Sequence, residues 1–542
     1  MTEHHHPEPE GAGDNTYKWL ALFVVVIGTF MVMLDSSIVN IAIPKMMNVF
    51  GTDLDSIKWV LTGYTLAMGA VVPITGFLSD TFGIKKLFIG ALGLFTIGSF
   101  LCGFSWSNNV MVIFRVVQAV GGGAIMPVGM SYIMQIFPLH ERGKALGFWG
   151  IASMAAPAIG PTLGGYIIQY MDWRFIFYVN VPIGIFGVIF ASILLKDTPL
   201  VPYKGDFDFI GLVSSIVGIV SLLYVLGEAD TIDWGNVKFP LLIALGVFGL
   251  VIFVYNELTH PNPMLELRVL KIYDFTLSQF ITGITTLALM GGVYVLPLFL
   301  QNLRGYTAMQ TGLILFPSAI ASGLMMPVSG AIFDKFGAKV VTLPGLLILA
   351  FATYQMSLFN MDTPSTYITI VAAIRGIGLG LAMMPVNTAA MNAVPRHLYG
   401  KATALSTTIR SILQAVSVTF MTTIISGSTN VNYARLAEQI TPFNRTASSV
   451  ITMLKGVYWS YGLPQVDAME NAYATIGQVI YGQAYLDAMN HAVALTVPIV
   501  FVAIVLVLMM SPKKATGQKK GPTQEGEKVT HEPETGVAAI ME

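Results

Sequence analysis

Charge and cysteine are both scarce in this sequence. Only 11% of its 542 residues are charged, whereas 54% are hydrophobic. A soluble domain carries about 25% charged residues, so this chain could not cover a water-facing surface. The net charge of −1 offers no basic surface, and we expect no nucleic-acid partner. The single cysteine, Cys102, excludes an internal disulfide and a cysteine-based metal site.

Clustered catalytic residues are lacking as well. The histidines outside the two tails are dispersed, and no acid/base or metal-binding cluster accompanies them. They are His140, His260, His397 and His491. No segment near the N-terminus has the design of a cleavable signal peptide. We therefore predict a protein that is not an enzyme and that uses no metal or other cofactor, with protons as its coupling ion as argued below.

Long apolar runs dominate the chain instead. A helix needs about 20 apolar residues to cross about 30 Å of hydrocarbon. Fourteen segments meet this length, near residues 18–43, 56–78, 86–106, 109–136, 144–170, 174–195, 208–228, 238–257, 273–301, 309–332, 339–359, 365–391, 401–427 and 487–510. The predicted fold class is an all-α integral membrane protein with 14 transmembrane helices.

A glycine–aspartate cassette occurs twice, as G-F-L-S-D-T-F-G-I-K-K (76–86) and G-A-I-F-D-K-F-G-A-K (330–339). Each copy lies between two apolar segments, which indicates a duplicated membrane protein, the usual plan of a secondary transporter. The duplication predicts two pseudo-symmetric six-helix bundles, at 18–196 and 259–511, with two inserted helices at 197–258. The tails are 1–17 and 512–542, and a long loop, 428–486, belongs to the second bundle.

Basic residues predict the orientation. The loops on one side contain most of the Lys and Arg residues, and the positive-inside rule places that side in the cytoplasm. These residues are Lys85, Lys86, Arg142, Lys144, Lys196, Lys204, Arg268, Lys271, Lys335, Lys339, Arg396 and Lys401. An even number of spans puts both termini there, in a multi-pass protein of the cytoplasmic (inner) membrane, and loop 428–486 outside.

Asp35 is an acid within the first span. It lies about 25 Å along the helix from Lys18 and about 14 Å from Pro44. An ionisable group at that depth costs about 2.5–3.5 kcal/mol, so it should face a cavity or a partner. Such an acid could hold either a proton or a cationic substrate; the alternative is a structural aspartate pinned by hydrogen bonds. Arg115, in the fourth span at similar depth, could pair with it, or could snorkel or bond backbone carbonyls.

Three other groups of residues are candidates for transport roles. For gating, the cassettes and the next basic loop supply Asp80, Lys85, Lys86, Arg142, Asp334 and Lys339, because an aspartate can bond the N-terminus of a neighbouring helix; a solvated turn is the alternative. For a substrate cavity, polar and aromatic residues at membrane depth are Asn40, Thr62, Tyr64, Gln118, Trp149 and Asn387; helix–helix packing is the alternative. Arg375 and Arg410 are also intramembrane.

The fifth span is rich in helix-breaking residues. Its glycines and prolines would permit close packing and bending, as in a helix that rocks against its neighbours. Close packing alone is the alternative. The residues are Gly147, Gly150, Gly160, Gly164, Gly165, Pro157 and Pro161.

Five segments in order resemble motifs of the major facilitator superfamily, and more closely of its fourteen-span drug:proton antiporters of the EmrB/QacA type. They are L-D-S-S-I-V-N-I-A-I-P (34–44), the first cassette, the fourth-span run from Arg115 to Gly123, Gly160-Pro161-x-x-Gly164-Gly165 as the antiporter motif, and W-R-F-I-F-Y-V-N-V-P (173–182). Ala119 and Ala156 replace glycines of the pattern.

The resemblance implies a proton-coupled antiporter that exports lipophilic drugs or toxic small molecules by alternating access. In that reading Asp35 and Arg115 serve proton coupling, the cassette residues gate the cytoplasmic side, and the fifth helix couples the gates. The expected partners are small lipophilic, in some cases cationic, substrates and membrane lipids, and the protein is expected to be a monomer. A superfamily exporter dedicated to one metabolite, lipid or antibiotic is the alternative.

Overall fold

The computed structural model describes residues 12–197, 208–228, 235–261, 263–441 and 443–511. Every regular element in these ranges is helical, and fourteen helical segments are long and apolar enough to cross a membrane. The predicted all-α fold with fourteen spans is therefore confirmed. Outside the described ranges lie residues 1–11 of the predicted N-terminal tail, the predicted tail 512–542 and part of the link before the inserted helices. Residues 12–17, predicted as tail, belong to the first helix.

The N-terminal half comprises nine helices that make six spans, and a short 3₁₀ turn, η1 (Val72–Ile74), joins the two parts of the second span. The helices are α1 (Ala12–Phe50), α2 (Leu54–Ile57), α3 (Trp59–Val71), α4 (Thr75–Phe82), α5 (Ile84–Gly103), α6 (Asn108–Ile136), α7 (Arg142–Tyr170), α8 (Phe175–Tyr178) and α9 (Asn180–Leu194).

The inserted pair, α10 (Phe209–Gly227) and α11 (Lys238–Thr259), precedes a C-terminal half of six further spans. That half comprises η3 (Leu267–Lys271), α12 (Tyr273–Met290), η4 (Gly291–Val295), α13 (Leu296–Leu298), η5 (Phe299–Leu303), α14 (Ala308–Phe336), α15 (Ala338–Met356), α16 (Ser365–Asn392), η6 (Arg396–Leu398), α17 (Tyr399–Ala437), α18 (Arg445–Ser460) and α19 (Gln465–Met509). Two of its elements, η4 and η5, are π-helical.

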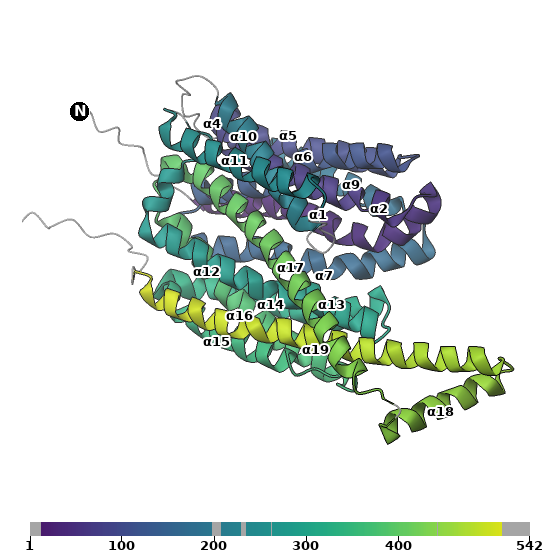
Figure 1. The fold of residues 1–542 in the computed structure, drawn as a ribbon. Helices are drawn as coiled ribbons and strands as arrows, with labels where there is room; N and C mark the ends of the chain where they lie inside the picture. The colour runs from purple at the N-terminus through teal and green to yellow at the C-terminus, as the bar shows by residue number, and fades with distance from the viewer. Residues whose placement is uncertain (1–11, 198–207, 229–234, 262, 442, 512–542) are drawn as a thin grey trace, which may run out of the picture.

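The segment 428–486, expected as a loop, is mostly helical. Helix α17 continues to Ala437, α18 follows, and α19 begins at Gln465. Asn444 accepts hydrogen bonds from two backbone N–H groups at the start of α18, and the Tyr458 hydroxyl lies 2.7 Å from that of Thr475 on α19. Figure 1 shows α18 and the first part of α19 extending beyond the other helices. The prediction relied on hydropathy, which detects membrane crossing and says little about a polar helix.

Both cassettes have the same backbone conformation. Gly83 ends α4 with φ +84°, and Gly337 ends α14 with φ +83°. A residue with a side chain rarely adopts this φ, so each glycine permits a tight turn between two antiparallel helices. We call the end of the molecule with these two turns the cassette end, and the other the opposite end.

Among the described residues, the cluster with buried members from both halves lies toward the cassette end. One buried cluster joins residues of the N-terminal half, such as Phe137 and Trp149, to Met384, Tyr399 and Leu405 of the C-terminal half. The other two clusters each belong to a single half, and the one at the opposite end of the N-terminal half includes Met46 and Trp173. The structure is therefore sealed between the halves at the cassette end.

The inserted helix α10 contacts both halves. Near the opposite end, Lys58 forms an ion pair with Glu228 at 2.9 Å, and Trp59 stacks on Tyr224 with ring centroids 5.7 Å apart. Thr419 of α17 donates a hydrogen bond to the Leu226 carbonyl at 3.0 Å. Helix α10 thus packs on both α3 and α17, and α11 packs on α10.

Candidate functional site

Asp35 and Arg115 meet inside the N-terminal half. Nη1 of Arg115 on α6 lies 2.6 Å from Oδ2 of Asp35 on α1, and both residues are wholly buried. The two charges that the sequence placed at similar depth are therefore a buried ion pair. An isolated charge in hydrocarbon is costly, and a partner with good hydrogen-bond geometry offsets that cost.

The second carboxylate oxygen of Asp35 has its own donors. Nε2 of Gln118 and Nδ2 of Asn180 each lie 2.9 Å from Oδ1. Gln118 also donates to the Ser99 hydroxyl at 2.5 Å and accepts from Arg115 at 2.6 Å. Side chains from four helices, α1, α5, α6 and α9, converge here, and the two oxygens of Asp35 together accept from three N–H donors.

The guanidinium of Arg115 is held from several sides. Its Nε lies 3.4 Å from the Val60 carbonyl oxygen, and its Cζ lies 3.8 Å from the centroid of the Tyr64 ring and 5.7 Å from that of Phe177. A cation over an aromatic face is attracted by the ring quadrupole. Tyr64 is consequently buried against Arg115, and its hydroxyl has no hydrogen-bond partner among the described residues.

Ser99 and Asn180 were not singled out from the sequence as members of this site. Asn180 lies in the segment W-R-F-I-F-Y-V-N-V-P, and the resemblance of this segment to a family motif could have identified it as a candidate. The sequence offers no feature that would identify Ser99, because a serine within an apolar span is more often a helix–helix contact.

At the cassette end, Asp334 bridges the two halves. Its Oδ1 accepts from the Gly143 N–H and its Oδ2 from the Lys144 N–H, both at 3.1 Å. These are among the first backbone N–H groups of α7, which lack partners within the helix and attract negative charge. The expectation that a cassette aspartate bonds a neighbouring helix N-terminus is matched by this geometry.

Asp80 occupies the corresponding place in the other cassette. A Cβ added at Gly400 would lie 3.6 Å from Asp80 Oδ1, and one added at Gly76 would lie 3.2 Å from the Lys401 Cα. Gly400 and Lys401 begin α17 as Gly143 and Lys144 begin α7. Each cassette therefore packs on a G-K pair at the start of a helix in the opposite half.

Arg142 lies between these two contacts and is buried. Its guanidinium donates to the Met134 and Phe137 carbonyls of its own half, at 2.6 and 3.1 Å. It also donates to the Tyr399 hydroxyl at 2.7 Å and to Asn392 at 3.2 Å, both in the other half. Arg142 thus ties α6 to the ends of α16 and α17.

The cassette lysines lie differently. Lys339 donates to the Leu508 carbonyl at 2.7 Å, within its own half. Lys85 is partly exposed and Lys86 is exposed. The contacts described here between the halves are made by the aspartates, glycines and Arg142, and their roles in gating stay predictions.

The fifth span, α7, packs tightly on both α1 and α14. A Cβ added at Gly160 would lie 2.5 Å from the Ser37 hydroxyl oxygen, and one at Gly164 would lie 2.8 Å from Ile38. One at Gly147 would lie 2.6 Å from the Met326 carbonyl oxygen. Near the opposite end, a Cβ added at Gly312 of α14 would lie 2.7 Å from Thr162 and 3.6 Å from Pro161, and one at Gly165 would lie 3.6 Å from Met309. The glycines allow this close approach on two faces of one helix.

The residues predicted to line a cavity lie in varied surroundings. Gln118 and Tyr64 belong to the Asp35 site, and Trp149 is buried with its Nε1 donating to the Thr29 hydroxyl at 2.9 Å. Asn387 is buried, Thr62 is partly exposed, and Asn40 is exposed with its amide donating to the Ser36 carbonyl.

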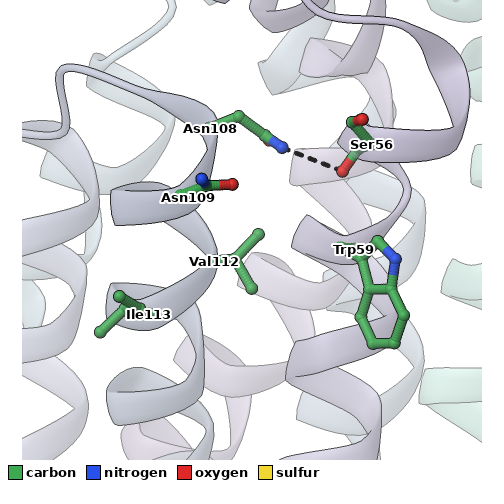
Figure 2. A pocket seen from close by; sticks show the side chains of 6 residues that line it. All are labelled: Ser56, Trp59, Asn108, Asn109, Val112 and Ile113. Carbon is green, nitrogen blue, oxygen red and sulfur yellow. Dashed lines mark hydrogen bonds between the residues drawn. The ribbon is translucent and has the colours of Figure 1, made fainter.

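Figure 2 shows a surface pocket between α3 and α6 near the opposite end. Asn108 donates to the Ser56 carbonyl at 3.0 Å beside Trp59, and Val112 and Ile113 complete the wall. None of the predicted cavity residues lines it.

The two intramembrane arginines of the C-terminal half have no described carboxylate partner. Arg375 is buried on α16 and donates to the Ala288 and Leu289 carbonyls, where α12 passes into the π-helical segment η4. A Cβ added at Gly292 would lie 1.8 Å from Arg375 Nη1, so this glycine makes room for the guanidinium. Arg410 on α17 is partly exposed.

Comparison with known proteins agrees with the motif content. Residues 25–418 match the model of the Major Facilitator Superfamily. The chain is 41% identical to the MFS-type transporter YhcA of Bacillus subtilis over 77% of this chain and 78% of that one. It is 28% identical to the multidrug export protein EmrB of Escherichia coli, over 91% and 95%. The crystal structure of the human organic anion transporter MFSD10 superposes with a TM-score of 0.56 at 12% identity, covering 90% of this chain and 99% of that one, which shows likeness of fold alone.

Proposed function

The chain belongs to the major facilitator superfamily, and from that membership we propose that it is a proton-coupled antiporter exporting lipophilic small molecules, drugs among them, across the cytoplasmic membrane. Membership makes it a multi-pass membrane transporter and not an enzyme. The similarity to a multidrug export protein over most of both chains supports the direction and the type of substrate. We place the cassette end and both termini in the cytoplasm because the basic loops lie there.

The observation that carries proton coupling is the Asp35–Arg115 pair. The carboxyl group of Asp35 is buried and accepts from three donors. A proton arriving at Asp35 would cancel the attraction to Arg115 and leave a buried guanidinium without its counter-charge, which is unfavourable. Protonation of Asp35 therefore favours a different arrangement of α1 and α6. The proton then binds one arrangement more tightly than the other, which is what coupling to transport requires.

A physical route leads from this pair to the contact between the halves. Ser37 and Ile38, which follow Asp35 closely on α1, are the residues on which Gly160 and Gly164 of α7 pack. The other face of α7 packs on α14 in the C-terminal half. A shift of α1 would press on α7, because no space separates them. The structure is closed at the cassette end, which in the proposed orientation is the cytoplasmic gate.

The test is proton-driven export in proteoliposomes with the Asp35→Asn variant. We expect export driven by a pH gradient to fall at least tenfold, because the amide cannot exchange the proton. The unfolding temperature should also fall, because Arg115 loses its buried counter-charge, so export is compared at equal amounts of folded protein. Asp487→Asn, which removes an exposed carboxylate at the opposite end, is the matched control and should export normally. Export by Asp35→Asn at the parent rate would show that coupling resides elsewhere.

A further inference from the structure

Arg410 is a charged residue at the middle depth of the C-terminal half. It lies on α17, eleven residues after Tyr399 and therefore about 16 Å from the cassette end of that helix. No described carboxylate lies within ion-pair distance of it. Arg410 differs in this from Arg115, its counterpart as a membrane-depth cation in the N-terminal half.

The surroundings of Arg410 place it just beyond the seal between the halves. The preceding residue, Ile409, packs against the core that joins the two halves. Ser406, one turn earlier, lies 3.3 Å from Gln279 of α12, and Leu413, one turn later, packs on Gly283 of α12. Arg410 lies between these two contacts on the same helix face and is partly exposed, and Gln414, one turn further on, is exposed.

A charge exposed to hydrocarbon at this depth would be strongly unfavourable. On this ground we assign the exposed part of Arg410 to water, and, because the shared core lies toward the cassette end, to water between the halves on the opposite side of that core. Gln414, one turn further along α17, is exposed and would add a polar group to the same water-facing surface.

The other membrane-depth charges described above are already engaged. Asp35 is wholly buried and bonded to Arg115, Gln118 and Asn180, so it offers no free carboxylate to a cationic substrate in this state. Arg375 is buried and donates to two backbone carbonyls. Arg410 is the remaining partly exposed charge, and its sign is positive.

We propose that Arg410 binds the acidic group of the exported molecule, so that the substrates of this exporter are lipophilic anions such as carboxylates and sulfonates. A planar guanidinium matches two oxygens of such a group at once. The proposal rests on the proposed export function and narrows its substrate class. It differs from the expectation that some of the lipophilic substrates are cationic.

The first test measures the charge around Arg410 without any substrate. A single cysteine is placed by Gln414→Cys in a Cys102→Ala background, and its reaction rates with an anionic (sulfonatoethyl) and a cationic (trimethylammonioethyl) methanethiosulfonate reagent are compared. We expect Arg410→Gln to lower the anion-to-cation rate ratio at least tenfold, and Arg410→Lys to preserve most of it. A cysteine that reacts with neither reagent, or a ratio that Arg410→Gln leaves unchanged, would overturn the proposal.

The second test measures recognition with a matched pair of dyes in detergent, where no proton gradient is needed. The anion 8-anilinonaphthalene-1-sulfonate and the neutral N-phenyl-1-naphthylamine share an aromatic skeleton and differ by the sulfonate. We expect Arg410→Gln to weaken binding of the anion at least tenfold and of the neutral dye less than twofold. Arg435→Gln, which removes an exposed arginine elsewhere on α17, should change neither.

The two dye results separate this proposal from the proposed function. Equal weakening of both dyes by Arg410→Gln, or a parent protein that binds ethidium but not the anion, would refute an anion site. Asp35→Asn should still bind the anionic dye even where it no longer exports, so loss of proton coupling and loss of anion recognition have different signatures.

Discussion

At the scale of single residues, the buried arginines of the fourth and twelfth membrane spans, Arg115 and Arg375, are stabilised in two different ways. Arg115 is neutralised by the carboxylate of Asp35, whereas Arg375 is satisfied by the Ala288 and Leu289 carbonyls. The second solution needs a helix whose carbonyls are free, and the π-helical turn after α12 changes the local hydrogen bonding in that way. It also needs space, which Gly292 provides.

Gly292→Ala should destabilise the protein. The new Cβ would lie 1.8 Å from Arg375 Nη1, so the guanidinium would have to leave its carbonyl partners. Overpacking and the loss of these bonds should together cost about 2–4 kcal/mol. Thermal unfolding of the purified protein measures the loss. Gly90→Ala is the control, since nothing lies within 4 Å of a Cβ added there, and it should be neutral or slightly stabilising.

At the scale of elements, the start of a helix is the unit of contact between the halves. The backbone N–H groups that begin α7 are satisfied by Asp334 of the other half rather than by a cap within the chain segment before them. When the cassette end opens, these groups lose the carboxylate and must find water instead. The cost of that exchange stabilises the closed state.

Asp334→Asn should shift the protein toward states open at the cassette end. The asparagine oxygen keeps one acceptor but loses the charge and the second acceptor, which should cost the closed state about 0.5–2 kcal/mol. Spin labels at the exposed residues Lys86 and His397, in a Cys102→Ala background, would report the distance across this end. An unchanged distance distribution would show that Asp334 is no latch. Asp487→Asn is the matched charge control.

At the scale of the whole molecule, the two halves are joined at one end by a shared core and along α7 and α14, while α10 packs on both α3 and α17. Alternating access in this arrangement requires the cassette end to open. The contact of Ser79 with Gly400 is a suitable place to prevent it, because a Cβ added at Gly400 would lie 3.8 Å from the Ser79 Cβ.

A disulfide between Ser79→Cys and Gly400→Cys should lock the transporter. Two Cβ atoms at that distance match disulfide geometry. In a Cys102→Ala background, oxidation should abolish export by proteoliposomes, because the cross-linked protein cannot leave the closed state. A reducing agent should restore export. Each single cysteine variant should be insensitive to oxidant. Full export by the cross-linked protein would show that this end does not open during transport.

The sequence by itself determined the fourteen spans, the duplication and the depth of Asp35 and Arg115. Hydropathy reports crossing of hydrocarbon, and a helix rise of 1.5 Å per residue converts position into depth. It could not determine rotation, because an apolar helix in a membrane shows little difference between the face toward lipid and the face toward protein. For that reason the sequence could not show that Gln118 and Tyr64, predicted to line a cavity, contact Asp35 and Arg115.

Only the tertiary structure decided which groups meet. It brought Ser99 and Asn180 to Asp35, placed Asp334 on the start of a helix in the other half, and left Arg410 partly exposed, with no carboxylate of the described residues within ion-pair distance. It also made the segment 428–486 largely helical. These outcomes depend on contacts between residues far apart in the chain, and the free energy of a buried charge or an uncapped helix end is set by such neighbours rather than by local sequence.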